Sequence, residues 1–171
     1  MDDKTWLGAL AKAKVTASLL HHRWEVFTPV TGKAPFDLIA VRGLQLRKVE
    51  VKGCGTRRPN GGFAVHLRSI RPNRSGNTIR FLDPAVSDVV AVYLEPIDRT
   101  CFFRTTELAG RSTITVHEQP SPNGTPRHLI ADYAMLDDGT VAERTKATAL
   151  KVVDPRGSVG SNPTRSAPPS R

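Results

Sequence analysis

The chain has 171 residues, a hydrophobic fraction of 39% and a net charge of +9, values that fit a globular domain with a polyanionic partner. No apolar stretch approaches the length that spans a bilayer, and the first residues lack the basic and apolar regions of a secretory signal, so we expect a cytoplasmic location. Two cysteines, Cys54 and Cys101, are too few for a disulfide scaffold or a cysteine zinc site, and we expect buried free thiols.

The first part of the chain predicts a helix followed by short strands. Residues 4–22 carry apolar side chains at helical spacing. The positions expected to face the core are Leu7, Leu10, Ala13, Ala17 and Leu20. A short strand at 24–29 ends at a proline. Two further strands, 36–42 and 46–52, lie on either side of Gly43 and predict a hairpin.

The next part predicts more strands, separated by loops. Residues 53–62 form a loop rich in glycine and arginine, and 63–68 alternate as a strand does. A second polar, basic loop is expected at 72–78. The continuous apolar run at 89–94 predicts a buried strand, and 101–104 predicts its neighbour.

Beyond the strands we expect a capped short helix at 105–108, an edge strand at 113–118 and a last helix at 126–136. The order of helix, strands and helix predicts an α/β or α+β domain over residues 1–138. The apolar periodicity fades after that, and residues 139–171 are expected to form a disordered basic tail.

Asp37, Glu50 and Lys52 form the constellation with the clearest chemistry. Side chains two apart on a strand share a face, so Glu50 and Lys52 point the same way, and an antiparallel hairpin brings Asp37 to that face. Carboxylates are ligands for Mg²⁺, with Mn²⁺ as an alternative, and the Val51 carbonyl would be a further hard oxygen ligand. The alternative interpretation is a surface ion pair on a hairpin.

A run of basic residues surrounds this constellation. Glu50 is the sole acidic residue between Arg42 and Arg80. An isolated carboxylate among cations is expected where a metal and a phosphate both bind. The candidate DNA contacts are Lys12, Arg57, Arg58, Arg68, Arg71 and Arg74, with solvated loops as the alternative for the arginines.

Pro35-Phe36-Asp37 followed by Glu50-Val51-Lys52 resembles the signature of the PD-(D/E)XK nuclease superfamily. The longer segment KAKVTASLLHHRWEVFTPVTGKAPFDLIAVRGLQLRKVEVK resembles the helix–strand–hairpin core of one branch. That branch contains group I intron-encoded homing endonucleases and endonuclease domains with the fold of archaeal Holliday-junction resolvases. Two later segments, GFAVHLRS and SDVVAVYLEPIDRTCFFRTTELAGR, resemble the same branch, so the likeness covers roughly residues 4–135.

The resemblance implies a restriction-endonuclease-like core in which helices flank a mixed central β-sheet. It implies magnesium-dependent cleavage of DNA, with Asp37 and Glu50 as metal ligands and Lys52 beside the attacking water. Homologues with this core often work as dimers or tetramers, so the resemblance also implies a homo-oligomer. We expect no membrane partner.

Lys12 departs from the family pattern, because many members carry a glutamate at this position of the first helix. A lysine cannot bind magnesium, although it is able to contact a phosphate. The rival hypothesis is therefore a nuclease-fold module that binds nucleic acid but has weak or no activity. A nuclease acting on RNA is a third hypothesis.

The tail has a possible origin in non-coding DNA. Val-Gly-Ser-Asn-Pro-Thr is what the DNA GTT-GGT-TCG-AAT-CCC-ACC encodes, and that DNA resembles the T-arm of a tRNA gene. We hypothesise that the reading frame runs into a tRNA gene from about residue 142 onward, which suits an open reading frame in or beside a mobile element.

Overall fold

The computed structural model describes residues 3–31, 33–73 and 76–136, and for 70–73 and 76–78 it describes the backbone alone. These ranges fall within the compact unit Met1–Asp138. The predicted tail, 139–171, and its interpretation as a translated tRNA gene lie outside the described residues.

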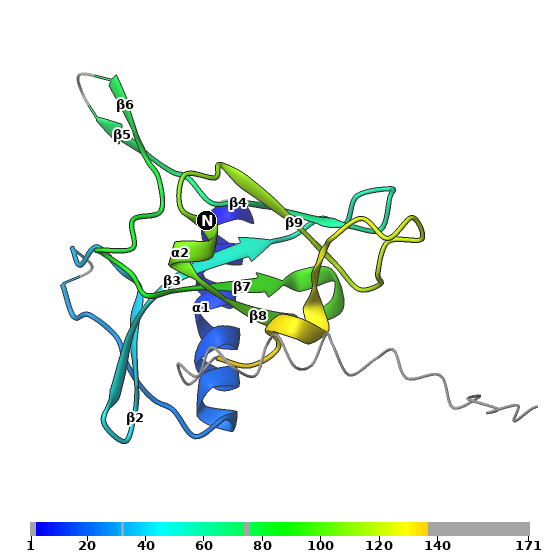
Figure 1. Ribbon diagram of the computed structural model, residues 1–171. Helices are drawn as coiled ribbons and strands as arrows, with labels where there is room; N and C mark the ends of the chain where they lie inside the picture. The colour runs from blue at the N-terminus through cyan, green and yellow to red at the C-terminus, as the bar shows by residue number, and fades with distance from the viewer. Residues whose placement is uncertain (1–2, 32, 74–75, 137–171) are drawn as a thin grey trace, which may run out of the picture. The chain divides into compact units, whose positions relative to one another are not determined.

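A five-stranded mixed sheet forms the centre of the domain (Figure 1), in the order β1-β2-β3-β7-β8. Its strands are β1 (Glu25–Phe27), β2 (Leu38–Arg42), β3 (Gln45–Cys54), β7 (Val89–Leu94) and β8 (Arg99–Arg104). Only β3 and β7 are parallel, and the other neighbours in this sheet are antiparallel. The predicted hairpin of β2 and β3 is therefore confirmed, as is the mixed sheet.

Two smaller β-structures accompany the central sheet. The strands β4 (Phe63–His66), β9 (Thr113–His117) and β10 (His128–Leu129) form a three-stranded sheet in the order β10-β9-β4. The strands β5 (Ser69–Asn73) and β6 (Gly76–Arg80) pair with each other as a hairpin, which projects from the body of the domain in Figure 1.

Few helices complete the domain. The long helix α1 (Asp3–His21) opens the chain, and α2 (Thr105–Leu108) directly follows β8. Two 3₁₀ turns, η1 (Glu95–Ile97) and η2 (Ile130–Tyr133), follow β7 and β10.

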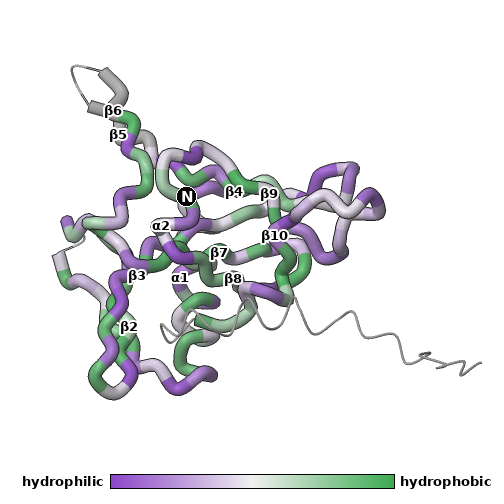
Figure 2. The backbone as a smooth tube through the Cα atoms, viewed as in Figure 1, coloured by the Kyte–Doolittle hydropathy of each residue, from purple (hydrophilic) through white to green (hydrophobic). Residues whose placement is uncertain are grey.

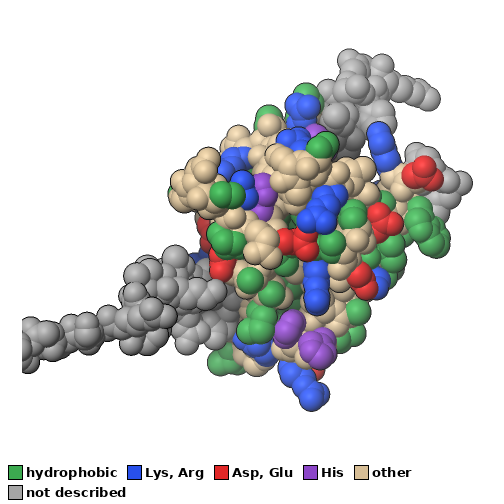
Figure 3. Space-filling model, turned by 90° about the vertical axis from the view of Figure 1, so that its right-hand side faces the viewer, with side chains coloured by type: hydrophobic (Ala, Val, Ile, Leu, Met, Phe, Trp, Pro, Cys, Tyr) green, Lys and Arg blue, Asp and Glu red, His purple; other side chains and the backbone are tan. Residues whose placement is uncertain are grey.

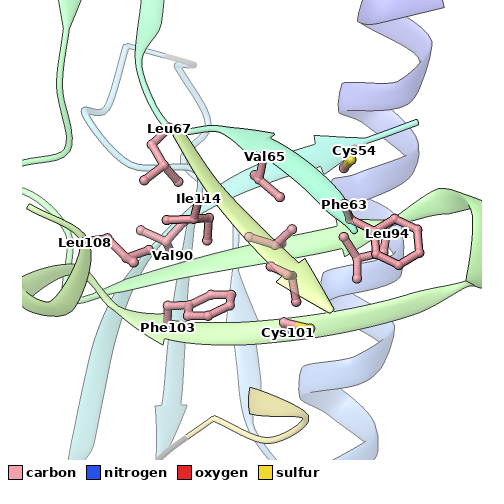
Figure 4. Packing of buried hydrophobic residues seen from close by; sticks show 12 residues of the cluster. Cys54, Phe63, Val65, Leu67, Val90, Leu94, Cys101, Phe103, Leu108 and Ile114 are labelled. Atoms are coloured by element: carbon pink, nitrogen blue, oxygen red, sulfur yellow. The ribbon is translucent and has the colours of Figure 1, made fainter. Parts of the chain in front are cut away.

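The central sheet is covered on both faces. On one face, Val15 and Leu19 of α1 pack with Trp24, Val49 and Ala91. The other face packs against the three-stranded sheet and α2 (Figure 4), through Val90, Val92, Leu94, Phe103, Phe63, Val65, Leu108, Ile114 and Val116. All six residues of β7 are buried because successive side chains enter opposite cores. Figure 2 accordingly shows hydrophobic residues in the central strands and hydrophilic residues in many of the connections.

Both cysteines are buried free thiols, as the sequence predicted. Burial raises the pKa of the Cys101 thiol to about 12. Burial also raises the pKa of Cys54, whose Sγ donates a hydrogen bond to the Thr56 carbonyl 3.3 Å away. Both thiols are therefore protonated and unreactive at neutral pH.

The predicted core face of the first helix was partly wrong. The buried residues of α1 are Ala11, Val15 and Leu19, whereas the predicted Ala13 and Ala17 are exposed and Leu20 is 54% exposed. The true face repeats every four residues. Alanines occur all round this helix, so the apolar pattern alone does not indicate which side is buried.

Three later elements also differ from the predictions. In the basic loop expected at 72–78, residues 72–73 belong to β5 and 76–78 to β6. Pro72 is tolerated there because a two-stranded ribbon leaves one side of each strand unpaired. The expected edge strand at 113–118 is the middle strand β9. Residues 126–136 contain β10 and the turn η2 in place of an α-helix, because His128 and Leu129 pair with β9 and therefore take an extended conformation.

We predict that Phe103→Ala lowers the free energy of unfolding by about 3–5 kcal/mol, because it removes a buried ring that stacks on Tyr133 with centroids 4.1 Å apart. Urea denaturation followed by circular dichroism measures this change. The fully exposed Leu44 provides the control, since Leu44→Ala should shift stability by no more than about 0.5 kcal/mol. Equal effects of the two variants would contradict the assigned core.

Candidate active site

An open cleft of about 390 Å³ contains the residues that the sequence pattern singled out. It lies where α1, the segment before β2, the middle of β3 and the base of the β5–β6 hairpin meet. Its charged and hydroxyl-bearing residues include Lys12, Asp37, Glu50, Lys52, Ser69 and Arg80. Four of these come from the predicted constellation and helix, and two come from the hairpin.

Asp37 is fixed by two hydrogen bonds with the backbone of β3. Its amide donates to the Val49 carbonyl at 2.9 Å, which extends the ladder by one residue beyond Leu38. Its Oδ2 accepts a hydrogen bond of 2.9 Å from the Val51 amide. The carboxylate is therefore held against β3 by one oxygen, and Oδ1 is left for another partner.

Lys12 of α1 is that partner. Its Nζ lies 2.6 Å from Asp37 Oδ1, with the lysine side chain 49% exposed and the aspartate side chain 22% exposed. The structure therefore places the lysine at the position where the family resemblance expects a glutamate. The positively charged Lys12 ammonium thus contacts the Asp37 oxygen that is not bonded to β3.

Glu50 and Lys52 share one face of β3, as the alternation of the strand requires. Lys52 Nζ lies 2.9 Å from Glu50 Oε1 and donates a second hydrogen bond of 2.9 Å to Ser69 Oγ. The side chain of Glu50 is only 20% exposed, and that of Lys52 only 13%. Since this part of β3 pairs with β7, the backbone beneath the two residues is held in place.

The donor set fits a hard divalent cation such as Mg²⁺. Two carboxylates, Asp37 and Glu50, line the cleft together with Val51. The N–H and C=O groups of a strand residue point to the same side of the strand. The Val51 amide donates to Asp37, so the Val51 carbonyl also points toward the side of β3 on which Asp37 lies. Within the described ranges, no three His, Cys, Asp or Glu side chains converge. Mg²⁺ commonly binds through one or two carboxylates and keeps waters and substrate phosphates as its other ligands.

Among the other predicted DNA contacts, the three with described side chains, Arg57, Arg58 and Arg68, do not line this cleft. Arg57 forms an ion pair with Glu118 and lies over the Phe63 ring. Arg58 and Arg68 are exposed and do not line the cleft. The side chain of Arg71 and the whole of Arg74 lie outside the described residues.

The described arginines at 57, 58 and 68 thus lie away from the cleft that contains Glu50, although they are close to it in sequence. The face of the molecule in Figure 3 likewise has basic and acidic side chains interspersed. Of the cations from Arg42 to Arg80 whose side chains the structure describes, Lys52 and Arg80 line the cleft.

Two residues at the cleft were not predicted as part of the site. Ser69 and Arg80 are register partners at the base of the β5–β6 hairpin. Arg80 Nη2 donates to the Pro35 carbonyl at 3.3 Å, two residues before Asp37. Ser69 ends the segment GFAVHLRS, just past a strand near the predicted site, but the sequence assigns it no role. The sequence signal for the hairpin is weak, so the place of Arg80 at the cleft comes from the three-dimensional structure.

A larger hollow, of about 800 Å³, lies between α1 and the segments around η1 and η2. Its acidic residues are paired within the protein: Asp98 with Lys14 at 2.8 Å, and Glu118 with Arg57. The acidic side chains of the smaller cleft are also paired with cations, so pairing does not distinguish the two hollows. The smaller cleft is the candidate site because it holds both carboxylates of the predicted constellation beside Lys52.

The fold and this cleft define a nuclease of the restriction-endonuclease-like class. The chain belongs to the PD-(D/E)XK endonuclease family, whose family model matches residues 1–136. A solved structure with a similar fold is that of the bacterial homing endonuclease I-Ssp6803I, with a TM-score of 0.67 and 21% sequence identity. The match covers 89% of this chain and 100% of that chain.

The comparison with curated proteins found no match. A search of the described helices for a membrane span was also negative, since none combines the necessary length and apolar character.

We predict that Lys12→Gln raises the affinity for Mn²⁺ roughly tenfold, because it removes a positive charge beside the Asp37 oxygen. Isothermal titration calorimetry without DNA measures the change. The matched control is Lys14→Gln on the same helix, which breaks an ion pair outside the cleft and should leave Mn²⁺ affinity unchanged. Weaker Mn²⁺ binding by Lys12→Gln would show that Lys12 does not oppose the metal.

Proposed function

We propose that this member of the PD-(D/E)XK family is a metal-dependent endonuclease that hydrolyses phosphodiester bonds of DNA. Asp37, Glu50 and the Val51 carbonyl would hold the Mg²⁺, or Mn²⁺ in its place. When bound there, the divalent cation supplies charge stabilisation at the phosphoryl group and lowers the pKa of a coordinated water.

The chain's own residues have separate roles in this proposal. The Val51 amide orients Asp37 through its bond to Oδ2, so that Oδ1 is available for a cation. The Lys52 ammonium orients the attacking water and offsets the negative charge that develops on the phosphoryl oxygens. Lys12 and Arg80 are the cleft cations suited to binding phosphate oxygens of the DNA backbone.

The observation that carries the proposal is the convergence of Asp37, Glu50 and Lys52 in one cleft. Asp37 precedes β2 and the other two residues stand on β3, yet the three are tied together through the Val51 amide and the Lys52–Glu50 ion pair. A surface ion pair on an isolated hairpin, the alternative interpretation of the motif, would not be enclosed by a helix and a second hairpin. Here α1 and the β5–β6 hairpin both contribute side chains to the cleft.

We predict that Asp37→Ala abolishes metal-dependent cleavage, with a loss of at least about a hundredfold in rate, because one of two carboxylate ligands is removed. Supercoiled plasmid and branched DNA, incubated with Mg²⁺ or with a chelator, provide the assay. Asp98→Ala is the matched control, since Asp98 is an exposed carboxylate paired with Lys14 outside the cleft. Full cleavage by Asp37→Ala would contradict the proposed site.

The second candidate is a module that binds nucleic acid without cutting it. The ion pair between Lys12 and Asp37 favours it, because an ammonium already occupies the carboxylate oxygen that a metal would use. Under this hypothesis the wild-type protein binds DNA but shows no cleavage that depends on metal.

Lys12→Glu distinguishes the two candidates. If the natural protein is a weak nuclease limited by metal binding, we predict that this variant binds Mn²⁺ more tightly and cleaves at a lower metal concentration. The same plasmid assay, titrated with Mn²⁺, measures the shift. Cleavage by Lys12→Glu but not by the wild type would support the non-cutting module as the natural function.

The proposal extends to the nucleic acid that is cut, the oligomeric state of the protein and its location in the cell. DNA is the preferred substrate, with RNA tested by competition in the same assay. A dimer or tetramer would place two clefts on opposite strands, because one cleft of this kind cuts one strand. A cytoplasmic location and an origin in a mobile element are likewise inferred from the sequence.

A further inference from the structure

Ser69 makes a direct contact with the lysine of the candidate site. Its Oγ accepts a hydrogen bond of 2.9 Å from Lys52 Nζ, and the same ammonium lies 2.9 Å from Glu50 Oε1. Ser69 is half-buried and lines the cleft. The lysine is thus held between one charged and one neutral acceptor.

The two acceptors differ in what else they bind. In the proposed function, Glu50 shares its carboxylate with a divalent cation, which weakens its attraction for the Lys52 ammonium. The Ser69 hydroxyl carries no charge and is a poorer ligand for such a cation than a carboxylate. The hydrogen bond to Ser69 therefore persists when the pull of Glu50 is reduced.

The position of Ser69 is itself well determined. Two residues earlier, Leu67 is 1% exposed and its amide donates to the Ser112 carbonyl at 2.9 Å. Across the hairpin, the register partner Arg80 donates to the Pro35 carbonyl. The hydroxyl is consequently fixed relative to β3 from both strands of the hairpin base.

We propose that Ser69 is a positioning residue, which holds the Lys52 ammonium in place while Glu50 binds the metal. The inference rests on the proposed function and names one more residue that the reaction requires. Ser69 acts through Lys52 and leaves the binding of DNA and metal to other residues. Its loss should therefore reduce kcat and leave both affinities unchanged.

The first test is steady-state cleavage of DNA by Ser69→Ala, Ser69→Thr and Ser18→Ala. We expect Ser69→Ala to lower kcat roughly tenfold with KM unchanged, which corresponds to the loss of one hydrogen bond in the transition state. Ser69→Thr keeps the hydroxyl and should recover most of the rate. Ser18→Ala is the matched control, because it removes a 2.9 Å hydroxyl contact with Thr100 outside the cleft. Wild-type kcat in Ser69→Ala would overturn the proposal.

The second test does not depend on activity. Reductive methylation of lysines with Mg²⁺ present, followed by peptide mass spectrometry, reports how firmly Lys52 is held. We expect Ser69→Ala to raise the methylation rate of Lys52 several-fold over wild type, with Lys14 unchanged as the internal reference. An unchanged rate at Lys52 would overturn the proposal. Failure of the nuclease function would appear separately, as a wild-type protein without metal-dependent cleavage.

Discussion

The hydrogen bond from the Val51 amide to Asp37 Oδ2 is the contact on which the arrangement of the site depends. It joins the segment before β2 to the strand that carries Glu50 and Lys52, and it uses one of the two aspartate oxygens. Because β3 also pairs with the buried strand β7, the backbone behind this contact is among the most constrained in the domain. The carboxylate is thus oriented before any ligand arrives, which is the condition for strong electrostatic stabilisation of a transition state.

The other aspartate oxygen, Oδ1, is the one available to a cation in the cleft. In the structure it contacts the Lys12 ammonium, which balances the charge of Asp37 as a monovalent cation. Under the proposed function, a divalent cation on the same oxygen would be repelled by this ammonium, so we expect the lysine to move when a metal binds. The displaced lysine would then be able to contact a DNA phosphate, and a lysine at this position would weaken metal binding without removing a contact for the substrate.

The hairpin motif made much of the site predictable from the sequence. Strand alternation alone places Glu50 beside Lys52, and the Asp37-to-Glu50 spacing fits an antiparallel hairpin, so the arrangement of these three residues follows from local rules. The central strand β7 was predictable for a similar reason, because a six-residue apolar run fits a strand that is buried on both faces.

Other features depend on tertiary structure and escaped prediction. The buried side of α1 is set by what packs against it, and its alanines are compatible with either side. The β5–β6 hairpin contains proline, glycine and asparagine, which have low strand propensity, so its strands and the place of Arg80 at the cleft were not apparent. Arg57 lies near Glu50 in the sequence, yet its ion pair is with Glu118, more than fifty residues away.

The most direct test of this account is the anomalous scattering of crystals grown with Mn²⁺ and a short DNA duplex. The proposed function predicts an anomalous peak about 2.2 Å from Asp37 Oδ1. Glu50 and the Val51 carbonyl would be the further ligands, and the Lys12 ammonium would be displaced from Asp37. A cleft without an anomalous peak, in which Lys12 still contacts Asp37 while DNA is bound, would contradict a metal-dependent nuclease.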